Sequence, residues 1–163
     1  MPATMERILQ LLRENARLSA AEIATQIGLT EPVVAARIAQ LEKEGAILGY
    51  HTVVDYEKVG QRGVIAYIEV KVTPESGGGF DRFARRVSQY DQVRGCYLMS
   101  GGFDIGVVVE GKDLYDVARF VAEKLSTIDV VLSTATHFQL RTYKHDGFLL
   151  NHPTSDGPLP VSP

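Results

Sequence analysis

Residues 19–44, SAAEIATQIGLTEPVVAARIAQLEKE, contain two short amphipathic segments separated by the turn residues 28–30. Ser19 and Glu22 have the spacing of a capping box, which predicts a helix that begins near Ala20. Its apolar residues Ile23, Ala24 and Ile27 recur at helical spacing, and Gly28 is a residue type that commonly ends a helix. The stretch predicts a helix-turn-helix, a motif that places its second helix in the major groove of DNA.

The second helix of the motif is expected to follow Thr30, which we place as its cap. Pro32 lies in the first turn, where a missing N–H costs nothing. Val34, Ile38 and Leu41 repeat at the spacing of one buried face. The remaining positions then face outwards wholly or in part: Glu31, Val33, Ala35, Ala36, Arg37 and Gln40.

The segments on either side of this motif complete a small domain. Upstream, an apolar stripe can close a three-helix core over it: Met5, Ile8, Leu11 and Leu12. Downstream, residues 45–55 hold two short apolar runs about a Gly-Tyr-His turn, which predicts a small hairpin. Residues 19–44 alone would also fit an ordinary helical hairpin, but the flanking segments favour a winged helix-turn-helix.

Composition indicates a globular chain of one ordinary domain or two small ones, with 163 residues and 45 % hydrophobic content. No apolar run approaches the ~20 residues needed to span a bilayer, and no signal-peptide pattern opens the sequence, so we expect a cytoplasmic protein. Cys96 is the single cysteine. It excludes an intrachain disulfide and is expected to be buried and inert.

The net charge of −3 is unfavourable for a DNA-binding protein, because much non-specific affinity comes from Lys and Arg at phosphates. Residues 1–62 carry seven basic and eight acidic residues, a net charge of −1. Any basic surface must therefore be local. Its candidates are Arg13, Arg17, Arg37 and Lys43, and a dimer would double their effect.

A different pattern begins after residue 62. Val64–Val72 alternates as a strand, a helical stripe follows near 80–87, and strands are predicted at 93–100 and 103–110. A second helix carries Leu114, Val117, Ala118, Val121 and Leu125, and residues 128–143 are predicted as one long final strand. The order strand-helix-strand-strand-helix-strand is that of a ferredoxin-like domain.

The predicted fold class is therefore α+β, in two domains and a tail. Residues 1–62 are assigned to the winged helix-turn-helix and a linker. Residues 63–146 form the ferredoxin-like domain. Residues 147–163 hold four prolines and are expected to be a disordered tail.

The sheet of the second domain is predicted to bind a second copy of the chain. Its helices cover one face, yet both alternating faces of the strands are substantially apolar. We assign to these faces Ile65, Tyr67, Tyr97, Met99, Val107, Val109, Phe138 and Leu140. Dimerisation through the sheet follows as an expectation.

Several short motifs, in this order, resemble those of the Lrp/AsnC family of prokaryotic transcription regulators. They are Asn15-Ala-Arg-Leu-Ser, Arg37-Ile with Leu41-Glu42, Gly45-Ala-Ile-Leu-Gly-Tyr, Ser100-Gly-Gly-Phe-Asp and Thr134-Ala-Thr. The resemblance covers about residues 5–146. It implies a homodimer that often assembles into an octamer, and a small effector, usually an amino acid, bound between C-terminal domains. It implies no cofactor.

The candidate DNA-binding residues surround the second helix: Arg17, Ser19, Thr30, Glu31, Val33, Ala36, Arg37 and Gln40. Gln can pair bidentately with adenine, and Arg with guanine or phosphate. Arg37 could equally form a structural pair with Glu22 or Glu44. Ser19 and Thr30 are first of all helix caps.

The candidate effector-binding residues, by family resemblance, are Ser100, Gly101, Gly102, Phe103, Asp104, Thr134 and Thr136. Glycines let a ligand carboxylate approach backbone amides, and Asp104 could bind an ammonium group. The alternatives are a plain β-turn at Gly101–Asp104 and threonines chosen only for strand propensity.

The leading hypothesis is a ligand-responsive transcription regulator and not an enzyme. The four histidines show no metal-ligand spacing, and no catalytic Ser-His-Asp arrangement appears. One alternative is an enzyme that reuses this architecture, as the siroheme decarboxylases do, because the recognition helix is poorly basic. Another is a metabolite-binding module that acts on a protein partner.

Overall fold

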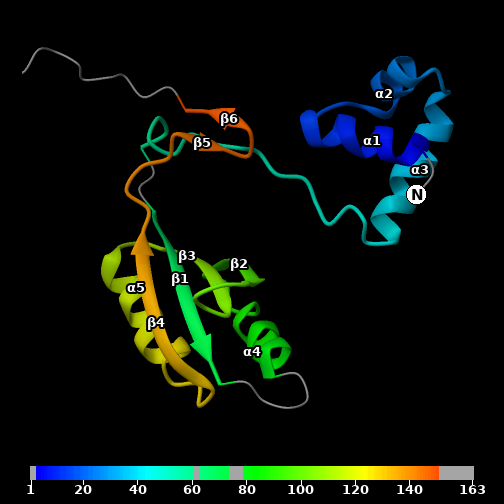
Figure 1. The fold of residues 1–163 in the computed structure, drawn as a ribbon. Coiled ribbons are helices and arrows are strands. Elements are labelled where there is room, and N and C mark those ends of the chain that lie inside the picture. The colour runs from blue at the N-terminus through cyan, green and yellow to red at the C-terminus, as the bar shows by residue number, and fades with distance from the viewer. Residues whose placement is uncertain (1–2, 61–62, 74–78, 151–163) are drawn as a thin grey trace, which may run out of the picture. The chain divides into compact units, whose positions relative to one another are not determined.

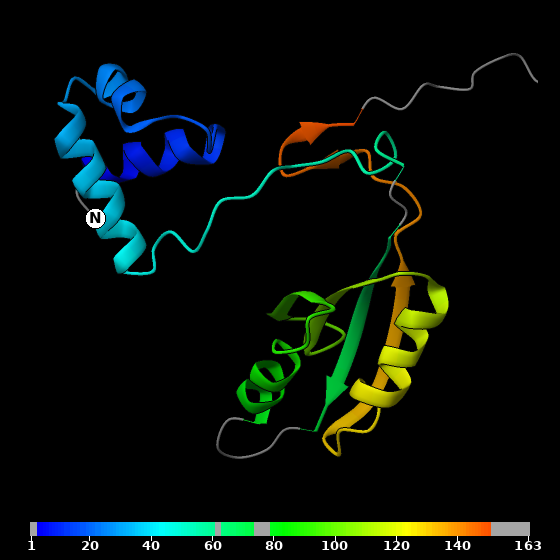
Figure 2. The same cartoon turned by 180° about the vertical axis from the view of Figure 1, so that it is seen from behind.

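A computed structural model describes residues 3–60, 63–73 and 79–150, and these residues form two compact units (Figure 1). The units span residues 1–53 and 54–163. The first holds helices α1 (Ala3–Glu14), α2 (Ala20–Ile27) and α3 (Glu31–Lys43). Figure 2 shows these three helices joined by short turns.

The apolar stripes predicted for the three helices form the core of the first unit. Eight side chains are buried there: Met5, Ile8, Leu11, Leu12, Ile23, Ala24, Val34 and Leu41. Ile38 and Ile27 pack against them half-buried. The helix-turn-helix prediction is therefore confirmed in its packing.

Helix α2 begins and ends at the residues that the sequence indicates, the Ser19–Glu22 capping box and Gly28. The Ser19 side chain accepts from the Glu22 backbone N–H at 3.2 Å, and the Ser19 N–H donates to the Glu22 carboxylate at 2.7 Å. Gly28 ends the helix in the left-handed conformation (φ 70°, ψ 32°), which a residue with a Cβ adopts at a cost. The chain can therefore turn sharply into α3.

One local prediction in this unit is confirmed only in position, and another is wrong. Thr30 occupies the N-cap of α3, but its side chain makes no capping hydrogen bond. Residues 45–55 form no paired strands, so the hairpin wing is absent from the described chain. Ala46 and Ile47 instead donate to the Leu41 carbonyl and finish α3, while the second apolar run straddles the boundary between the units.

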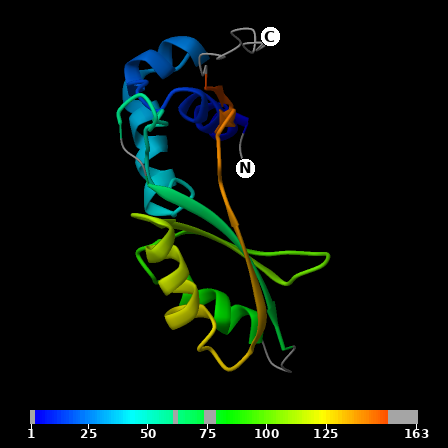
Figure 3. The same ribbon diagram turned by 90° about the vertical axis from the view of Figure 1, so that its left-hand side faces the viewer.

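The second unit is an antiparallel four-stranded sheet in the order β2-β3-β1-β4, with helices on one face. Its elements are β1 (Val64–Val72), α4 (Gly79–Val87), β2 (Val93–Leu98), β3 (Ile105–Gly111), α5 (Leu114–Phe120) and β4 (Val131–Phe138). Figure 3 shows α4 and α5 on the same side of the sheet. The ferredoxin-like prediction is confirmed.

The core of this unit lies between the sheet and the two helices. Ala66, Ile68 and Val70 of β1 are fully buried and pair with Val109, Val107 and Ile105 of β3, which are also fully buried. Phe83, Val117 and Phe120 cover them from the helices. Val107 and Val109, which are among the apolar residues cited for the two faces of the sheet, thus lie on the face under the helices and not on the face predicted for dimerisation. Phe138 likewise packs against this core.

The open face of the sheet, opposite the helices, carries a different set of side chains. Register places on it Ile65 and Tyr67 of β1, Gly106 and Val108 of β3, Gly95 and Tyr97 of β2, and Ala135 and His137 of β4. Glu69 of β1 lies 3.2 Å from His137 across the strand pair. The open face is thus apolar at its centre with polar groups on the β4 side.

The helix after β3 and the strand after it differ from the predicted ones. After α5 a π-helical turn, η1 (Val121–Leu125), lets both Phe120 and Leu125 reach the core, whereas Leu114 and Ala118 of the predicted stripe are exposed. β4 ends at Phe138 instead of continuing to Tyr143.

A small hairpin of β5 (Lys144–His145) and β6 (Phe148–Leu149) follows β4. It turns through Asp146 and Gly147, both with positive φ, which is the conformation that an Asp-Gly hairpin turn needs. The sequence predicts a disordered tail over residues 147–163, and this prediction is wrong for residues 147–149, which belong to the hairpin. Residues 151–163 lie outside the described residues.

Replacing the α2 cap should destabilise the first unit. Ser19→Ala removes the side chain that accepts from the Glu22 N–H, and loss of such a cap typically costs about 1 kcal/mol. Chemical denaturation measures the change. Thr25→Ala, which removes a hydroxyl that donates to the Ala21 carbonyl of the same helix, should leave stability unchanged or higher because Ala favours helix. Equal losses in both variants would contradict the capping role.

The capping box should also make stability depend on pH. Hydrogen bonds from the Ser19 backbone and side chain lower the pKa of Glu22 below 4.5. A lowered pKa adds stability above the unfolded-state value, and this contribution is lost as the pH falls through the folded-state value. Glu22→Gln should therefore be less stable than wild type at neutral pH, with the difference vanishing below pH 4.5. A stability difference between Glu22→Gln and wild type that stayed constant across this pH range would contradict the account.

Candidate functional site

The outer face of α3 presents an exposed row of side chains. Glu31, Val33, Ala35, Ala36, Arg37 and Gln40 are all exposed, as the helical spacing predicts. Val34 and Leu41 anchor the opposite side in the core, with 0 % and 1 % of their surface exposed. The outer row is thus held in a fixed orientation by the buried one.

Arg37, Gln40 and Glu44 form a chain of hydrogen bonds along this row. Arg37 Nη1 donates to Gln40 Oε1 at 3.3 Å, and Gln40 Nε2 donates to Glu44 Oε1 at 2.8 Å. Arg37 therefore bonds to a neutral amide, and no direct pair with Glu22 or Glu44, the structural alternative to a DNA contact, is seen among the described residues. Sequence reasoning did not assign Glu44 a role beside Gln40, although their i, i+4 spacing is the signal for one.

The other candidate DNA-binding residues lie at the two turns that flank α2. Ser19 is exposed and engaged in the capping box. The Arg17 side chain is exposed, and its backbone N–H donates to Asn15 Oδ1 at 3.0 Å, which fixes the turn before α2. Thr30 is exposed at the start of α3. Of these positions, Thr30 directly precedes the row on α3.

Charge along α3 and its cap is slightly negative. Glu31, Glu42 and Glu44 outnumber Arg37 and Lys43. Tyr50 Oη donates to Glu42 Oε1 at 3.0 Å, and the pKa of Tyr50 is raised, first by burial and then by this bond. The helix therefore offers one cation, Arg37, in the middle of its exposed row.

The turn from Ser100 to Asp104 joins β2 to β3. Ser100, Gly101 and Gly102 are exposed, and Gly101 has a φ of 127° that favours glycine. Phe103 is half-buried and meets the Tyr67 ring edge-on, with the ring centroids 6.1 Å apart. The turn is therefore linked to the open face of the sheet through an aromatic contact.

Asp104 has a structural role that the sequence did not reveal. Its Oδ2 accepts from the Val72 N–H at 2.9 Å, its N–H donates to the Val70 carbonyl at 3.1 Å, and its carbonyl accepts from Met99 at 2.8 Å. The bond to Val72 falls where the pairing of β1 with β4 shifts register. The carboxylate thus satisfies a backbone donor at this irregularity.

The two candidate effector elements lie on opposite sides of β1. Val70 pairs with Ile105, next to the turn, and on its other side with Thr134. With strands 4.7–4.9 Å apart, the two elements are separated by about 10 Å. Thr134 and Thr136 pair with Val70 and Ile68, so they lie on the helix side of the sheet and not on the open face. Hydroxyls there do not reach across an interface through the open face.

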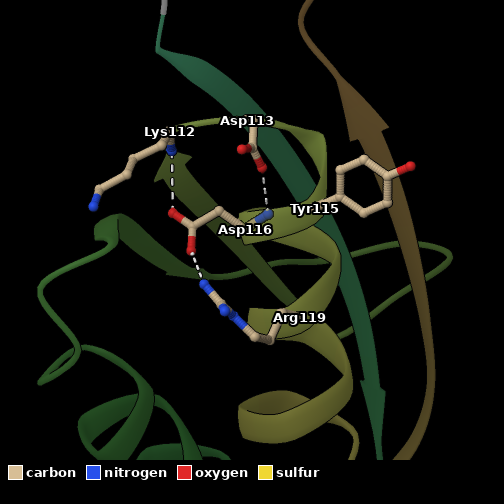
Figure 4. A pocket seen from close by; sticks show the side chains of 5 residues that line it. All are labelled: Lys112, Asp113, Tyr115, Asp116 and Arg119. Atoms are coloured by element: carbon tan, nitrogen blue, oxygen red, sulfur yellow. Dashed lines mark hydrogen bonds and ion pairs between the residues drawn. The ribbon is translucent and has the colours of Figure 1, made fainter.

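A cavity of about 360 Å³ beside the start of α5 is lined by charged residues (Figure 4). Asp116 accepts from the Lys112 backbone N–H at 3.1 Å and from Arg119 at 2.9 Å, and these bonds lower its pKa, the first more strongly. The Asp113 side chain caps the helix through the Asp116 N–H. These bonds link the charged groups to one another, so the cluster is best explained as a helix start.

Metal and membrane sites find no support in the described residues. No group of three or more His, Cys, Asp or Glu side chains is placed to hold a metal ion there. No helix among them is long and apolar enough to cross a membrane. Cys96 is half-buried beneath α4, less enclosed than expected, with its Sγ 3.9 Å from the Ala84 carbonyl.

Family models match both units. Residues 1–47 match a winged helix-turn-helix DNA-binding domain, and residues 65–149 match the Lrp/AsnC ligand binding domain. These matches cover the helix row and the Ser100–Asp104 turn respectively.

Several similar proteins are named as transcriptional regulators. The chain is 46 % identical over 157 residues to the HTH-type transcriptional regulator YugG of Bacillus subtilis, covering 96 % of this chain and 95 % of that protein. It is 33 % identical to the proline dehydrogenase transcriptional activator of Rhodobacter capsulatus, covering 83 % and 87 %. A transcriptional regulator of Neisseria meningitidis, solved with L-methionine, matches with a TM-score of 0.70 and 26 % identity, covering 89 % and 93 %.

Two substitutions of Asp104 should separate its structural role from ligand binding. Asp104→Ala leaves the Val72 N–H without its acceptor and should cost about 1–3 kcal/mol in chemical denaturation. Asp104→Asn keeps an oxygen acceptor and should retain most of that stability while losing the negative charge. Asp129→Ala, at an exposed position, is the control and should be near neutral. Full stability of Asp104→Ala would show that the bond to Val72 is unimportant.

Proposed function

Because the chain belongs to the Lrp/AsnC family of transcriptional regulators, we propose that it binds operator DNA as a homodimer with α3 in the major groove. Residues 1–62 serve DNA binding and linkage, residues 63–146 serve assembly and effector binding, and dimers can assemble further into octamers. The observation that best supports this proposal is the row of exposed side chains on α3, which lies opposite the buried residues Val34 and Leu41. The relatives named above are regulators, which gives the enzyme alternative no support.

In this proposal Arg37 and Gln40 contact the base edges in the major groove and recognise the sequence. A Gln amide pairs bidentately with adenine and an Arg guanidinium with guanine, each worth about 1–3 kcal/mol of discrimination. The two side chains already lie together, so they address neighbouring base pairs or one base pair and its phosphate. Arg17, Ser19 and Thr30, at the turns flanking α2, are placed for backbone contacts. The small residues Ala35 and Ala36 let the helix approach the base edges closely.

Because the exposed row of α3 carries little positive charge, its affinity for DNA depends mainly on contacts with specific bases. Few cations are available to release counterions from phosphate, so non-specific binding is weak and depends little on salt. A dimer presents two copies of α3, about 34–36 Å or a multiple of that apart along the duplex. Affinity then comes from two matched half-sites.

Effector binding is proposed at the Ser100–Asp104 turn. The exposed amides of Gly101 and Gly102 suit a carboxylate, and Asp104 retains Oδ1 for an ammonium group while Oδ2 holds Val72. Thr134 and Thr136 supply hydroxyls from the far side of β1 only if another copy of the chain brings a second turn towards them. The Neisseria complex with L-methionine supports an amino acid as the ligand class.

Dimerisation is proposed through the open face of the sheet. Two glycines there leave room for tyrosine rings: a Cβ on Gly106 would lie 2.2 Å from Tyr67 Oη, and one on Gly95 would lie 2.6 Å from Tyr97 Oη. The rings therefore lie flat across the strands, beside half-buried Val108. A flat aromatic and aliphatic surface of this kind suits packing against its own copy.

Substitutions on α3 should change DNA binding without changing the fold. Arg37→Ala and Gln40→Ala should each weaken binding to a selected operator about 10-fold or more, because a base contact is lost. Glu44→Gln should tighten binding, since it removes a negative charge near the phosphates and keeps an acceptor for Gln40. Fluorescence anisotropy at two salt concentrations measures all three.

The control for this set is Arg85→Ala, which removes the same charge from an exposed position on α4. It should leave operator affinity unchanged. If Arg37→Ala bound as wild type, or lost affinity only through lowered stability, the assignment of the α3 row to the groove would be wrong.

A charge on the open face should break the dimer. Val108→Lys places an ammonium at the centre of that face and should weaken self-association more than about 10-fold, because an unpaired buried charge is costly. Sedimentation at micromolar concentration measures the shift to monomer. Ala122→Lys, on the exposed side of η1, should sediment as wild type. A dimer that persists in Val108→Lys would place the interface elsewhere.

A further inference from the structure

A second cavity, of about 620 Å³, lies at the opposite end of β1 from the Ser100–Asp104 turn. We name it the strap pocket, because the segment that follows β4, residues 139–142, forms one wall. The start of β1 and the end of β3 form the floor, and the turn at residues 55–60 forms the remaining wall. Its volume is in the range of small-molecule sites.

Hydrogen bonds shape both walls of the strap pocket. The Gln139 N–H donates to the Ile65 carbonyl at 2.9 Å, and the Gln139 side chain bonds to the Thr142 hydroxyl. At the other wall, Lys58 contacts the Asp55 carboxylate through its N–H at 3.3 Å and its Nζ at 3.6 Å. The wall at residues 139–142 is therefore attached to β1, and the other wall is a turn closed by its own contacts.

The lining combines charges of both signs with apolar surface. Arg141 supplies a guanidinium, and Glu57 and Glu110 supply carboxylates. Arg94 holds Glu110 in position at 2.7 Å. Arg141 makes no hydrogen bond or ion pair within the part of the chain that the structure describes. A ligand carboxylate would find a cation there, and a ligand ammonium would find the carboxylates.

Apolar side chains in the same pocket are unusually exposed. Leu140 has 94 % of its surface exposed and Tyr56 has 50 %, and both line the cavity beside half-buried Ile65. Burying such surface is favourable at about 25 cal/mol per Å². The complementary ligand is therefore a small zwitterion with an apolar side chain.

We propose that the strap pocket is a second ligand site, which takes a neutral α-amino acid with an apolar side chain. The Arg141 guanidinium binds the carboxylate, Glu57 and Glu110 bind the ammonium group, and Tyr56 and Leu140 cover the side chain. Ile65 and Val70 mark the levels of the two sites on β1, five residues apart, which is about 17 Å along a strand. The site is thus separate from the proposed effector turn and does not depend on it.

A ligand in the strap pocket would contact residues that directly follow the DNA-binding unit in the chain. Tyr56 and Glu57 lie just after Val53, where the first compact unit ends. A ligand that bridges these residues and Arg141 fastens the start of the connecting segment to the sheet. Ligand binding at residues that follow the DNA-binding unit in the chain would then change DNA affinity by a coupling free energy.

Equilibrium dialysis with radiolabelled L-methionine, L-leucine and L-proline tests this proposal on the full chain. At least one of the three should bind in a manner that Arg141→Gln weakens about 10-fold or more, because a charge-assisted contact is lost. Arg85→Gln, the matched control on α4, should bind as wild type. Asp104→Asn should leave this binding intact, which separates failure of the turn site from failure of the strap pocket.

Hydrogen exchange with bound ligand supplies a second readout. Protection should rise at residues 54–60 and 139–142 in wild type and not in Arg141→Gln. Binding that is unaffected by Arg141→Gln for all three amino acids overturns the proposal, as does the absence of any binding. Protection of these segments without ligand, lost on dilution to monomer, would show that a second copy of the chain fills the pocket, and this outcome also overturns it.

Discussion

Val34 and Leu41 of α3 pack against α1 and α2, and this contact fixes which side of α3 faces solvent. The helix has 13 residues, and its outer row bears one cation and few large side chains. Neither charge nor propensity would orient such a helix reliably, so the buried contact does so. Gly28 acts with it, because its left-handed conformation sets the turn through which α2 leads into α3.

In the sheet, too, buried contacts decide which side chains face solvent. Strand register places Ala66, Ile68 and Val70 under the helices and therefore Tyr67 on the opposite face. Gly106 allows the Tyr67 ring to lie flat there, and Phe103 then connects this face to the Ser100–Asp104 turn. The surfaces proposed for assembly and for effector binding are thus physically continuous. A ligand at the turn and a second copy at the sheet would act on the same aromatic group.

Sequence periodicity predicted the parts of this protein that are governed by one buried face. The α2 capping box, the α3 row and the order of the ferredoxin-like elements follow from it. It failed at η1, which inserts a residue after Phe120. It could not tell which of the two apolar faces of β3 packs under the helices, and Val107 lies on that core face. It also could not show that Asp104 holds Val72 or that Gln40 bonds to Glu44, because partners in space depend on the packed fold. The Asp146-Gly147 pair is itself a sequence signal for a tight hairpin turn, and both residues adopt the positive φ that such a turn needs.

Selection of genomic DNA fragments by the purified protein, at low and at moderate salt, tests the central claim most directly. A regulator that reads bases through a dimer of α3 rows should enrich a few sites of two-fold symmetry, and that enrichment should persist at the higher salt because few phosphate contacts contribute. Sequencing of the retained fragments would give the half-site spacing for comparison with the helical repeat of DNA. Absence of enrichment, or binding to all fragments alike that disappears with salt, would contradict the account.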